Sequence, residues 1–302
     1  MGSTIHLSSL INRKEMNFNR KIIATVVIGL LCISSMKAQD HHTPRFRTDS
    51  YELLDQAHYM VMYELKSKYL SDQNSHFTSE NMLLIGKKIS KFFNPEVLKN
   101  QQYYESALDA IPSMPSRGLG AIEVFQCKGE NRDVVIHYPC NSFFGAQLYE
   151  DRPNFNWQIT AESKELLGYP CQKATCRFRG RNYEAWFTMQ LPLNNGPWKF
   201  RNLPGLILKV SDEKGDFIFT AKQVNRLKEP MPIVKYDLGG YDKVTRKEAN
   251  VFVKRYIEDT YDVLKAASVG TGVQVEQLTI NSDGTKSNAQ SPKITYVGLE
   301  LE

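Results

Sequence analysis

Short stretches in which apolar and polar residues alternate recur along this chain of 302 residues, with turn residues between them. The clearest is Tyr59–Tyr69, YMVMYELKSKY, where alternate side chains are large and apolar. A period of two places successive side chains on opposite faces of a β-strand. Pairs of such stretches around the turn sequences KGEN, RGRN and DEKG predict hairpins. The pattern therefore predicts a mainly β fold.

Two segments depart from this alternation and predict helices. Asn94 and Pro95 suit the N-cap and the first position of a helix that ends near Ala110. Thr245 and Glu248 have the spacing of a capping box ahead of a second helix. We therefore predict a mainly β domain of α+β character, a single curved antiparallel sheet or half-barrel with one helix near each end.

The first 38 residues have the features of a secretory signal peptide. A basic pair precedes the apolar run Ile22–Ile33, which is shorter than the about 20 residues that a membrane-spanning helix needs. Ala38 supplies a small residue for cleavage, and Met16 is an alternative translation start. The leader predicts an exported protein, located in the periplasm or at the outer membrane, or secreted.

Behind the leader we predict one β-rich domain over residues 39–267 and a loose segment over residues 268–302 with a short final strand. The whole chain has 38 Lys and Arg against 33 Asp and Glu. Removing the five basic residues and one acidic residue of the leader leaves 33 basic and 32 acidic residues. This near-neutral balance gives no indication of nucleic-acid binding. The mature chain has no apolar run long enough to span a membrane.

Four cysteines follow the leader, Cys127, Cys140, Cys171 and Cys176. An even number in an exported chain favours disulfides over a metal cluster. Cys171 and Cys176 lie five residues apart on one predicted strand, so they face opposite sides at a separation of about 16 Å. A disulfide needs Cα atoms within about 7 Å. The connectivity that pairs these two is disfavoured, and the other two connectivities stay open.

The residues that could carry catalysis form no recognisable constellation. His58, His76 and His137 have no neighbouring nucleophile or acid in sequence, and the hydrolase, zinc-protease and phosphate-loop motifs are absent. The adjacent acids Glu150-Asp151 and Glu258-Asp259 do not face one another on a strand or helix, so we expect them to be solvated. We predict no enzyme, no catalytic residues and no cofactor.

The predicted mature N-terminus, Gln39-Asp40-His41, offers one candidate metal site. A free amine, two amide nitrogens and the His41 imidazole would form a square-planar site suited to Cu(II) or Ni(II).

Gly196–Val210, GPWKFRNLPGLILKV, combines two prolines, two glycines and two aromatic residues ahead of an apolar run. In the structural interpretation the prolines set φ, Gly196 and Gly205 permit tight turns, and the apolar side chains plug one end of the sheet. In the functional interpretation the same side chains line the mouth of an apolar cavity. The candidate ligand-binding residues are Trp186, Trp198, Lys199, Phe200 and Leu203.

Residues 166–210, from LLGYPCQ to GLILKV, resemble the GLPGLI family of exported Bacteroidetes-type proteins, and MLLIGKKISKFF, NFNWQIT and VTRKEA extend the resemblance. Asn202 stands where the family motif begins with glycine, and Asn tolerates positive φ. The resemblance implies an envelope location and a β-rich fold, and the family brings no established activity.

From these observations we predict a non-enzymatic protein of the cell envelope that binds an apolar ligand in a curved β-sheet. The alternative is a structural or interaction accessory of an outer-membrane complex, which would use an exposed aromatic face or a strand edge.

Overall fold

The fold is taken from a computed structural model. The residues that it describes are 25–30, 50–71, 75–95, 121–138, 146–237, 240–267, 269, 274–280, 286–287 and 295–301.

One sheet of 12 strands is the main structure among the described residues, in the spatial order β13-β7-β6-β5-β4-β3-β2-β12-β11-β10-β9-β8. The first half of the chain supplies β2 (Tyr51–Ser67), β3 (Phe77–Gly86), β4 (Ile89–Phe93), β5 (Ala121–Cys127), β6 (Arg132–Tyr138) and β7 (Gln147–Asp151). The second half supplies β8 (Gln158–Leu166), β9 (Tyr169–Phe178), β10 (Arg181–Thr188), β11 (Leu206–Asp212), β12 (Phe217–Tyr236) and β13 (Asp242–Lys243).

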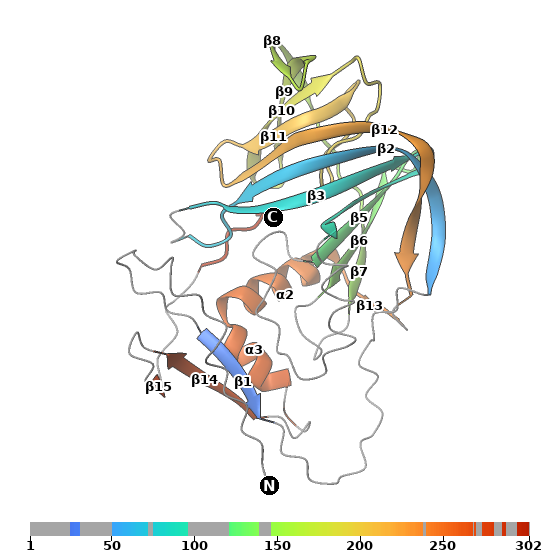
Figure 1. The fold of residues 1–302 in the computed structure, drawn as a ribbon. Coiled ribbons are helices and arrows are strands. Elements are labelled where there is room, and N and C mark those ends of the chain that lie inside the picture. Colours follow the sequence, from blue (N-terminus) through green and yellow to red (C-terminus); the bar gives the residue numbers. More distant parts are fainter. Residues whose placement is uncertain are drawn as a thin grey trace, which may run out of the picture.

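The two longest strands, β2 and β12, pair at the centre of this sheet. Three register irregularities interrupt their ladder, and the pair bends so that β8–β11 lie on one side and β3–β7 on the other (Figure 1). Register irregularities of this kind increase local twist, which curves the sheet without closing it into a barrel. The prediction of a mainly β protein with one large curved sheet is confirmed. The sheet is mixed and not purely antiparallel, because β13 runs parallel to β7.

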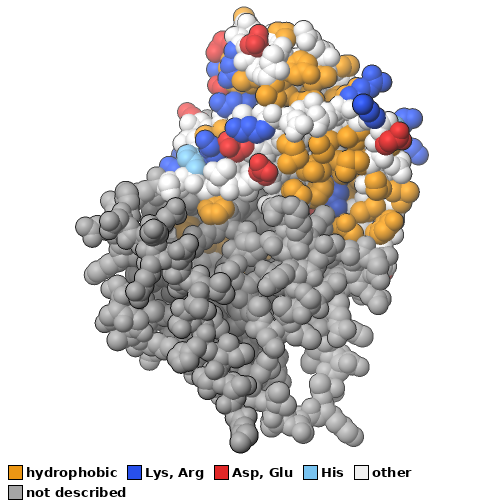
Figure 2. Space-filling model, viewed as in Figure 1, with side chains coloured by type: hydrophobic (Ala, Val, Ile, Leu, Met, Phe, Trp, Pro, Cys, Tyr) orange, Lys and Arg blue, Asp and Glu red, His pale blue; other side chains and the backbone are white. Residues whose placement is uncertain are grey.

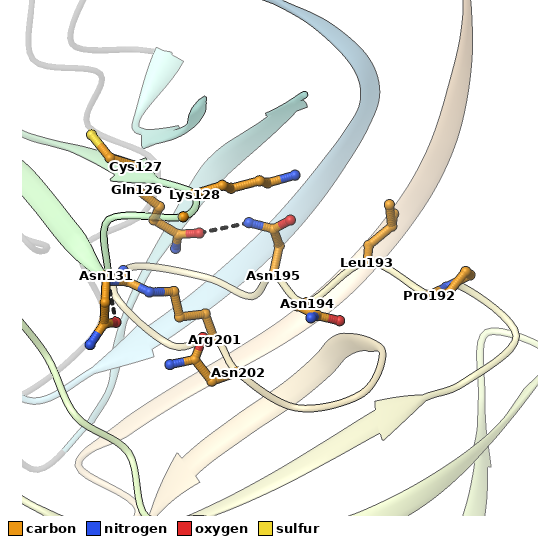
Figure 3. A pocket seen from close by; sticks show the side chains of 11 residues that line it. Gln126, Cys127, Lys128, Asn131, Pro192, Leu193, Asn194, Asn195, Arg201 and Asn202 are labelled. Atoms are coloured by element: carbon orange, nitrogen blue, oxygen red, sulfur yellow. Dashed lines mark hydrogen bonds between the residues drawn. The ribbon is translucent and has the colours of Figure 1, made fainter. Parts of the chain in front are cut away.

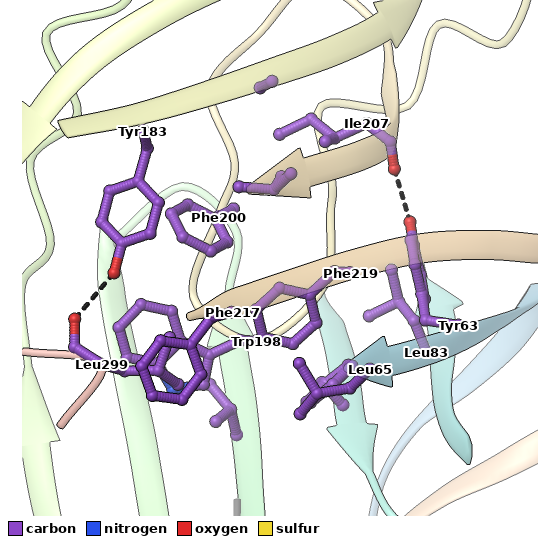
Figure 4. Packing of buried hydrophobic residues seen from close by; sticks show 14 of the residues in the cluster. Tyr63, Leu65, Leu83, Tyr183, Trp198, Phe200, Ile207, Phe217, Phe219 and Leu299 are labelled. Carbon is purple, nitrogen blue, oxygen red and sulfur yellow. Dashed lines mark hydrogen bonds between the residues drawn. The ribbon is translucent and has the colours of Figure 1, made fainter. Parts of the chain in front are cut away.

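The main hydrophobic core lies inside this bend. Alternate residues of β2, Val61, Tyr63 and Leu65, are fully buried, as the alternation predicts. Aromatic residues from β10 and β12 meet them across the core, and the Tyr63 hydroxyl donates a hydrogen bond to the Ile207 carbonyl at 2.6 Å (Figure 4). A second, smaller cluster covers the other face of β3–β6. Burial of alternate side chains on each strand therefore fixes the register of the sheet.

The described helices follow one another near the C-terminal end, α2 (Arg246–Glu258) and α3 (Thr260–Ala267). The capping box of Thr245 and Glu248 is present in both directions, as predicted. The prediction of one helix near each end is not shown, since both described helices lie in this C-terminal region. Beyond Pro95 the predicted first helix lies outside the described residues. A second sheet joins β1 (Thr25–Leu30), β14 (Gln274–Ile280) and β15 (Lys286–Ser287).

Apolar side chains also remain at the surface, and Figure 2 shows them gathered over the free ends of the long strand pair. Tyr51 and Leu53 of β2 are each 55% exposed, and Met231 of β12 is 36% exposed. None of the helices in the described ranges has both the length and the apolar character of a membrane span.

Candidate functional site

The connection between β10 and β11 enters the core instead of passing over the surface. Five side chains predicted to line an apolar mouth are buried, with exposed fractions of 7% or less: Trp186, Trp198, Lys199, Phe200 and Leu203. Phe200 lies at the centre of an aromatic cluster, with its ring centroid 4.9 Å from that of Tyr183 and 5.2 Å from that of Trp198 (Figure 4). These residues fill space in the core, and none of them lines the cavity described below.

Close packing explains the glycines of this connection. A Cβ atom on Gly205 would stand 2.0 Å from the Thr188 carbonyl oxygen, and one on Gly196 would stand 2.9 Å from the Ile207 side chain. Both glycines therefore permit close approach of neighbouring atoms. The positive φ angles of the connection belong to other residues, Trp198 at 53° and Asn202 at 71°. Asn202 thus has a positive φ, which Asn tolerates better than other non-glycine residues.

Beside this connection the described surface contains an open cavity of about 460 Å³ (Figure 3). Most of its lining residues are polar, and we call it the polar cavity for that reason, although apolar atoms supply more of its lining surface than polar atoms do. Two chain segments face one another across it, the hairpin turn between β5 and β6 and the segment 192–202, which we call the cavity loop. The lining residues are Gln126, Cys127, Lys128, Gly129, Asn131, Pro192, Leu193, Asn194, Asn195, Arg201 and Asn202. Five of these carry a side-chain amide, and none carries a carboxylate or an imidazole.

Hydrogen bonds within the lining fix the orientation of two amides. Gln126 Nε2 donates to the carbonyl oxygens of Gly196 and Trp198, at 3.1 and 2.7 Å. Because a carbonyl only accepts, the Gln126 Oε1 atom must face the other way, where it accepts from Asn195 Nδ2 at 2.9 Å. The Asn195 Nδ2 atom also donates to the Ser90 hydroxyl. This relay attaches the cavity loop to strands β4 and β5.

A buried ion pair forms the next layer. The Arg201 guanidinium contacts the Asp133 carboxylate, and its Nη2 atom donates to Asn131 Oδ1 at 3.1 Å. Burial raises the pKa of Asp133 to about 6, and the Arg201 charge opposes this rise. Arg201 thereby orients Asn131, whose own φ of 45° places it at the hairpin turn. Asn131, Asn194 and Asn202 are the lining amides that reach the surface.

A second buried charge cluster lies behind the cavity loop. Lys199, with no exposed surface, donates from Nζ to Asp151 Oδ2 at 2.7 Å, to Glu300 Oε1 at 2.6 Å and to the Tyr149 hydroxyl at 3.2 Å. Arg179 also contacts both carboxylates. Burial opposes ionisation of Asp151, yet the hydrogen bonds from Arg179 and the charge of Lys199 hold its pKa well below the ordinary value. The cluster is therefore charged at neutral pH.

The predicted carboxylate pairs separate in the structure. Asp151 lies in this buried cluster, so the expectation that it is solvated is wrong, whereas Glu150 is exposed and pairs with Arg132 at 2.7 Å. Adjacent residues of β7 point to opposite faces, which explains the difference. Glu258 Oε1 accepts a hydrogen bond from the Tyr296 backbone amide. No pair of facing carboxylates results from either sequence pair.

The cysteines are not paired with one another. Cys127, Cys171 and Cys176 are free, buried thiols, and Cys140 lies outside the described residues. The predicted disulfides are therefore not found among the three described cysteines, and burial raises the pKa of Cys176 to about 12. His41 also lies outside the described ranges. Within those ranges no three His, Cys, Asp or Glu side chains gather as metal ligands.

Comparison with known proteins gives one family match. The sequence model described as "N-glycanase peptide, N-terminal domain" matches residues 152–248, about a third of the chain. The match includes β8–β11 and the whole cavity loop. The hairpin turn on the opposite side of the cavity lies outside it. No curated protein matches the chain.

Solved structures give a weaker likeness. PNGF-II in space group P21 is 13% identical, with a TM-score of 0.45, and the alignment covers 66% of this chain and 33% of that chain. PNGF-II in space group C2 is 15% identical, with a TM-score of 0.42, over 63% and 31% of the two chains. This chain therefore spans about a third of the length of these solved chains. At these scores the likeness assigns no activity to it.

These findings correct the family and the function predicted from sequence. The matching family is the N-glycanase N-terminal domain and not the GLPGLI family. The match contradicts the predicted function, a GLPGLI-type envelope protein that binds an apolar ligand. It contradicts the alternative, an accessory of an outer-membrane complex, as well. Within the GLPGLI-like stretch 202–207, Leu203, Leu206 and Ile207 are buried in the main core, whereas Asn202 and Pro204 are exposed.

Sequence reasoning missed the polar cavity. Asn202 stands within the aromatic and proline-rich stretch Gly196–Val210, and Asn194 and Asn195 directly precede it. These polar residues beside so many apolar ones were the available signal. Asn131 and Asp133 lie more than 60 residues away in sequence, and only the pairing of the strands brings them to the cavity loop.

Proposed function

We propose that this chain is a saccharide-binding module related to the N-terminal domain of N-glycanases, and that its polar cavity binds a glycan. The observation that carries the proposal is the position of the cavity loop, which lies wholly within the matched range 152–248. Because that family is named for N-glycanases, we propose the glycans of glycoproteins as the ligand class.

The chemistry of the lining supports this ligand class. A side-chain amide offers both a hydrogen-bond donor and an acceptor, which suits the hydroxyl groups of a sugar. Asn131, Asn194 and Asn202 present such groups at the surface, and the Arg201 contact preorganises Asn131. Preorganised polar groups reduce the entropy lost on binding. Because the described lining has no carboxylate or imidazole, we assign it binding and not glycosidic bond cleavage.

The export predicted from residues 1–38 is part of this proposal. Glycoprotein glycans are exposed outside cells, so a module that binds them must reach the periplasm or the exterior. Edman sequencing or mass spectrometry of the protein recovered from culture would determine whether a leader is removed near Ala38.

Calorimetric titration with free N-glycans and with a glycopeptide tests the binding. Asn202→Gly removes one lining amide and keeps a residue that tolerates positive φ, so the backbone of the cavity loop is preserved. We expect Asn194→Ala and Asn202→Gly together to weaken binding at least tenfold. Asn225→Ala, on β12, is the control and should bind as the unaltered protein does. Absence of binding to any of these glycans, or equal binding by the double variant, would overturn the proposal.

A further inference from the structure

The C-terminal segment, residues 295–301, packs against the large sheet. The Val297 amide donates to the Tyr69 carbonyl at 2.7 Å, and the Tyr183 hydroxyl donates to the Leu299 carbonyl at 2.7 Å. The Tyr296 ring stacks on that of Tyr69. The Leu299 side chain joins the main core. Backbone hydrogen bonds and side-chain packing therefore both hold the segment in place.

Glu300 completes this docking with four side-chain contacts. Its Oε1 atom accepts from Lys199 and Arg179, both at 2.6 Å. Its Oε2 atom accepts from Arg246 at 2.8 Å and from Asn250 at 3.3 Å. Three cations thus converge on a carboxylate that is itself buried. Such a carboxylate cannot be removed without leaving buried positive charge uncompensated.

Lys199, the partner of Glu300, lies in the middle of the cavity loop, between Asn195 and Arg201. The loop around it holds two non-glycine residues at positive φ, Trp198 and Asn202. A bulky residue such as Trp is strained in this region, and strained conformations persist only when their surroundings impose them. The buried anchor of Lys199 is one of the contacts that impose this conformation.

The charges show what loss of Glu300 would do. Asp151 and Glu300 together neutralise Lys199 and Arg179, and Arg246 contacts Glu300 from the rim. Without Glu300 a single buried carboxylate, Asp151, would face both Lys199 and Arg179. Repulsion between the two cations and the strain at Trp198 would then both favour withdrawal of Lys199, which displaces the cavity loop.

We propose that residues 295–301 are a latch that holds the cavity loop in its saccharide-binding conformation, with Glu300 as the positioning residue. This inference rests on the proposed function of the cavity and adds a means of control to it. A partner or condition that displaces the latch would disorganise Asn194, Asn195 and Arg201 without touching the cavity itself.

Hydrogen–deuterium exchange, read by mass spectrometry on the full chain, tests the latch without any saccharide. In Glu300→Gln we expect amides of residues 194–202 to exchange at least tenfold faster, while the amides of β2 and β12 exchange as in the unaltered protein. Glu300→Asp keeps the charge and should restore most of the protection. Glu162→Gln, at an exposed position on β8, is the control. A uniform acceleration, or none within the loop, would show that Glu300 only stabilises the fold and would overturn the latch.

A second, milder variant keeps the latch testable in case Glu300→Gln does not fold. Arg246→Gln removes one contact to the outer oxygen of Glu300 at a partly exposed position, and it should give a smaller acceleration confined to the same loop. If Glu300→Gln does not fold, and the cavity loop of Arg246→Gln exchanges as it does in the unaltered protein, the latch is refuted.

Titration with the glycans separates the two proposals. We expect Glu300→Gln to weaken saccharide binding at least tenfold. If no glycan binds the unaltered protein but the exchange result holds, the saccharide function fails and the latch stands. If glycans bind the unaltered protein and Glu300→Gln equally, the latch fails and the saccharide function stands.

Discussion

His137, on β6, should control how the stability of this protein depends on pH between about 4 and 6.5. Its half-buried ring lies beside Tyr149 at a centroid distance of 5.6 Å, and its buried Nε2 atom has no hydrogen-bond partner among the described residues. Burial, aided by the positive charge of Lys199, lowers the pKa of His137 from 6.5 to about 4. In this pH range the unfolded chain binds a proton at this residue that the folded chain does not.

The sign and size follow from proton linkage. A histidine whose folded pKa is lowered contributes stability above its unfolded pKa, and this contribution is lost as pH falls toward the folded pKa. Each pKa unit corresponds to about 1.4 kcal/mol, so a shift of this size amounts to about 3 kcal/mol. Asp133 acts in the opposite direction, because its folded pKa is raised from 3.8 to about 6. Its contribution, also about 3 kcal/mol, is present below pH 3.8 and lost as pH rises through 6.

These two opposing terms should nearly cancel in the unaltered protein between pH 6 and 4. In His137→Gln only the Asp133 term remains, so we expect the free energy of unfolding to rise by about 3 kcal/mol as pH falls across this interval. In Asp133→Asn we expect it to fall by about the same amount. Urea denaturation followed by tryptophan fluorescence, at constant ionic strength and at several pH values, measures both slopes.

His137→Leu is the matched control, because it also removes the titrating ring but has a different shape. It should change the absolute stability and still give the same pH slope as His137→Gln. Parallel curves for the unaltered protein and His137→Gln would refute the reasoning, since they would mean that the buried ring binds protons equally in both states.

Further predictions concern the segment between β10 and β11 and its anchors. Phe200→Ala should lower the free energy of unfolding by about 3–5 kcal/mol in urea denaturation, because the ring is fully buried; a loss below about 1 kcal/mol would contradict the packing described. Gly205→Ala should lower the melting temperature more than Gly129→Ala, since the first Cβ would strike the Thr188 carbonyl, whereas the second would meet no atom within 4 Å and bear only the strain of a φ of 84°. Lys199→Met should cost about 3–5 kcal/mol, because Asp151 and Glu300 lose their shared ammonium group and are left with Arg179 and Arg246 as their cations; full stability would show that Lys199 contributes no net stabilisation to the cluster. Cys171 and Cys176 should resist iodoacetamide in the native protein and react after denaturation, as mapped by peptide mass spectrometry, whereas rapid native labelling would contradict their burial.

Local patterns were read correctly from sequence where one strand or one turn decides the outcome. The alternation in Tyr59–Tyr69 identified the buried face of β2, and the capping box identified the start of α2. The turn residues placed the hairpins that link β5 with β6 and β9 with β10. These signals are local because side-chain periodicity and backbone φ preferences act over a few residues.

The candidate site could not be read in this way. Lys199 looked like a residue at the mouth of a cavity, yet its ammonium group is buried between Asp151 and Glu300, which are 48 and 101 residues away in sequence. A lysine carries the same sequence signal whether its charge meets solvent or a distant carboxylate. The same holds for Asn131 and Asn195, which gain their orientation from Arg201 and Gln126.

The sequence by itself thus determined a mainly β fold, many of its strands and several hairpin turns, because each of these depends on neighbouring residues, but it did not identify β7, β8 or β13. Only the tertiary structure decided that the aromatic segment fills the core, that a polar cavity lies beside it and that the C-terminal residues anchor it. The physical reason is that burial and charge compensation depend on which segments the strand order brings together. In this sheet β2 and β12 pair at the centre although they come from opposite ends of the domain.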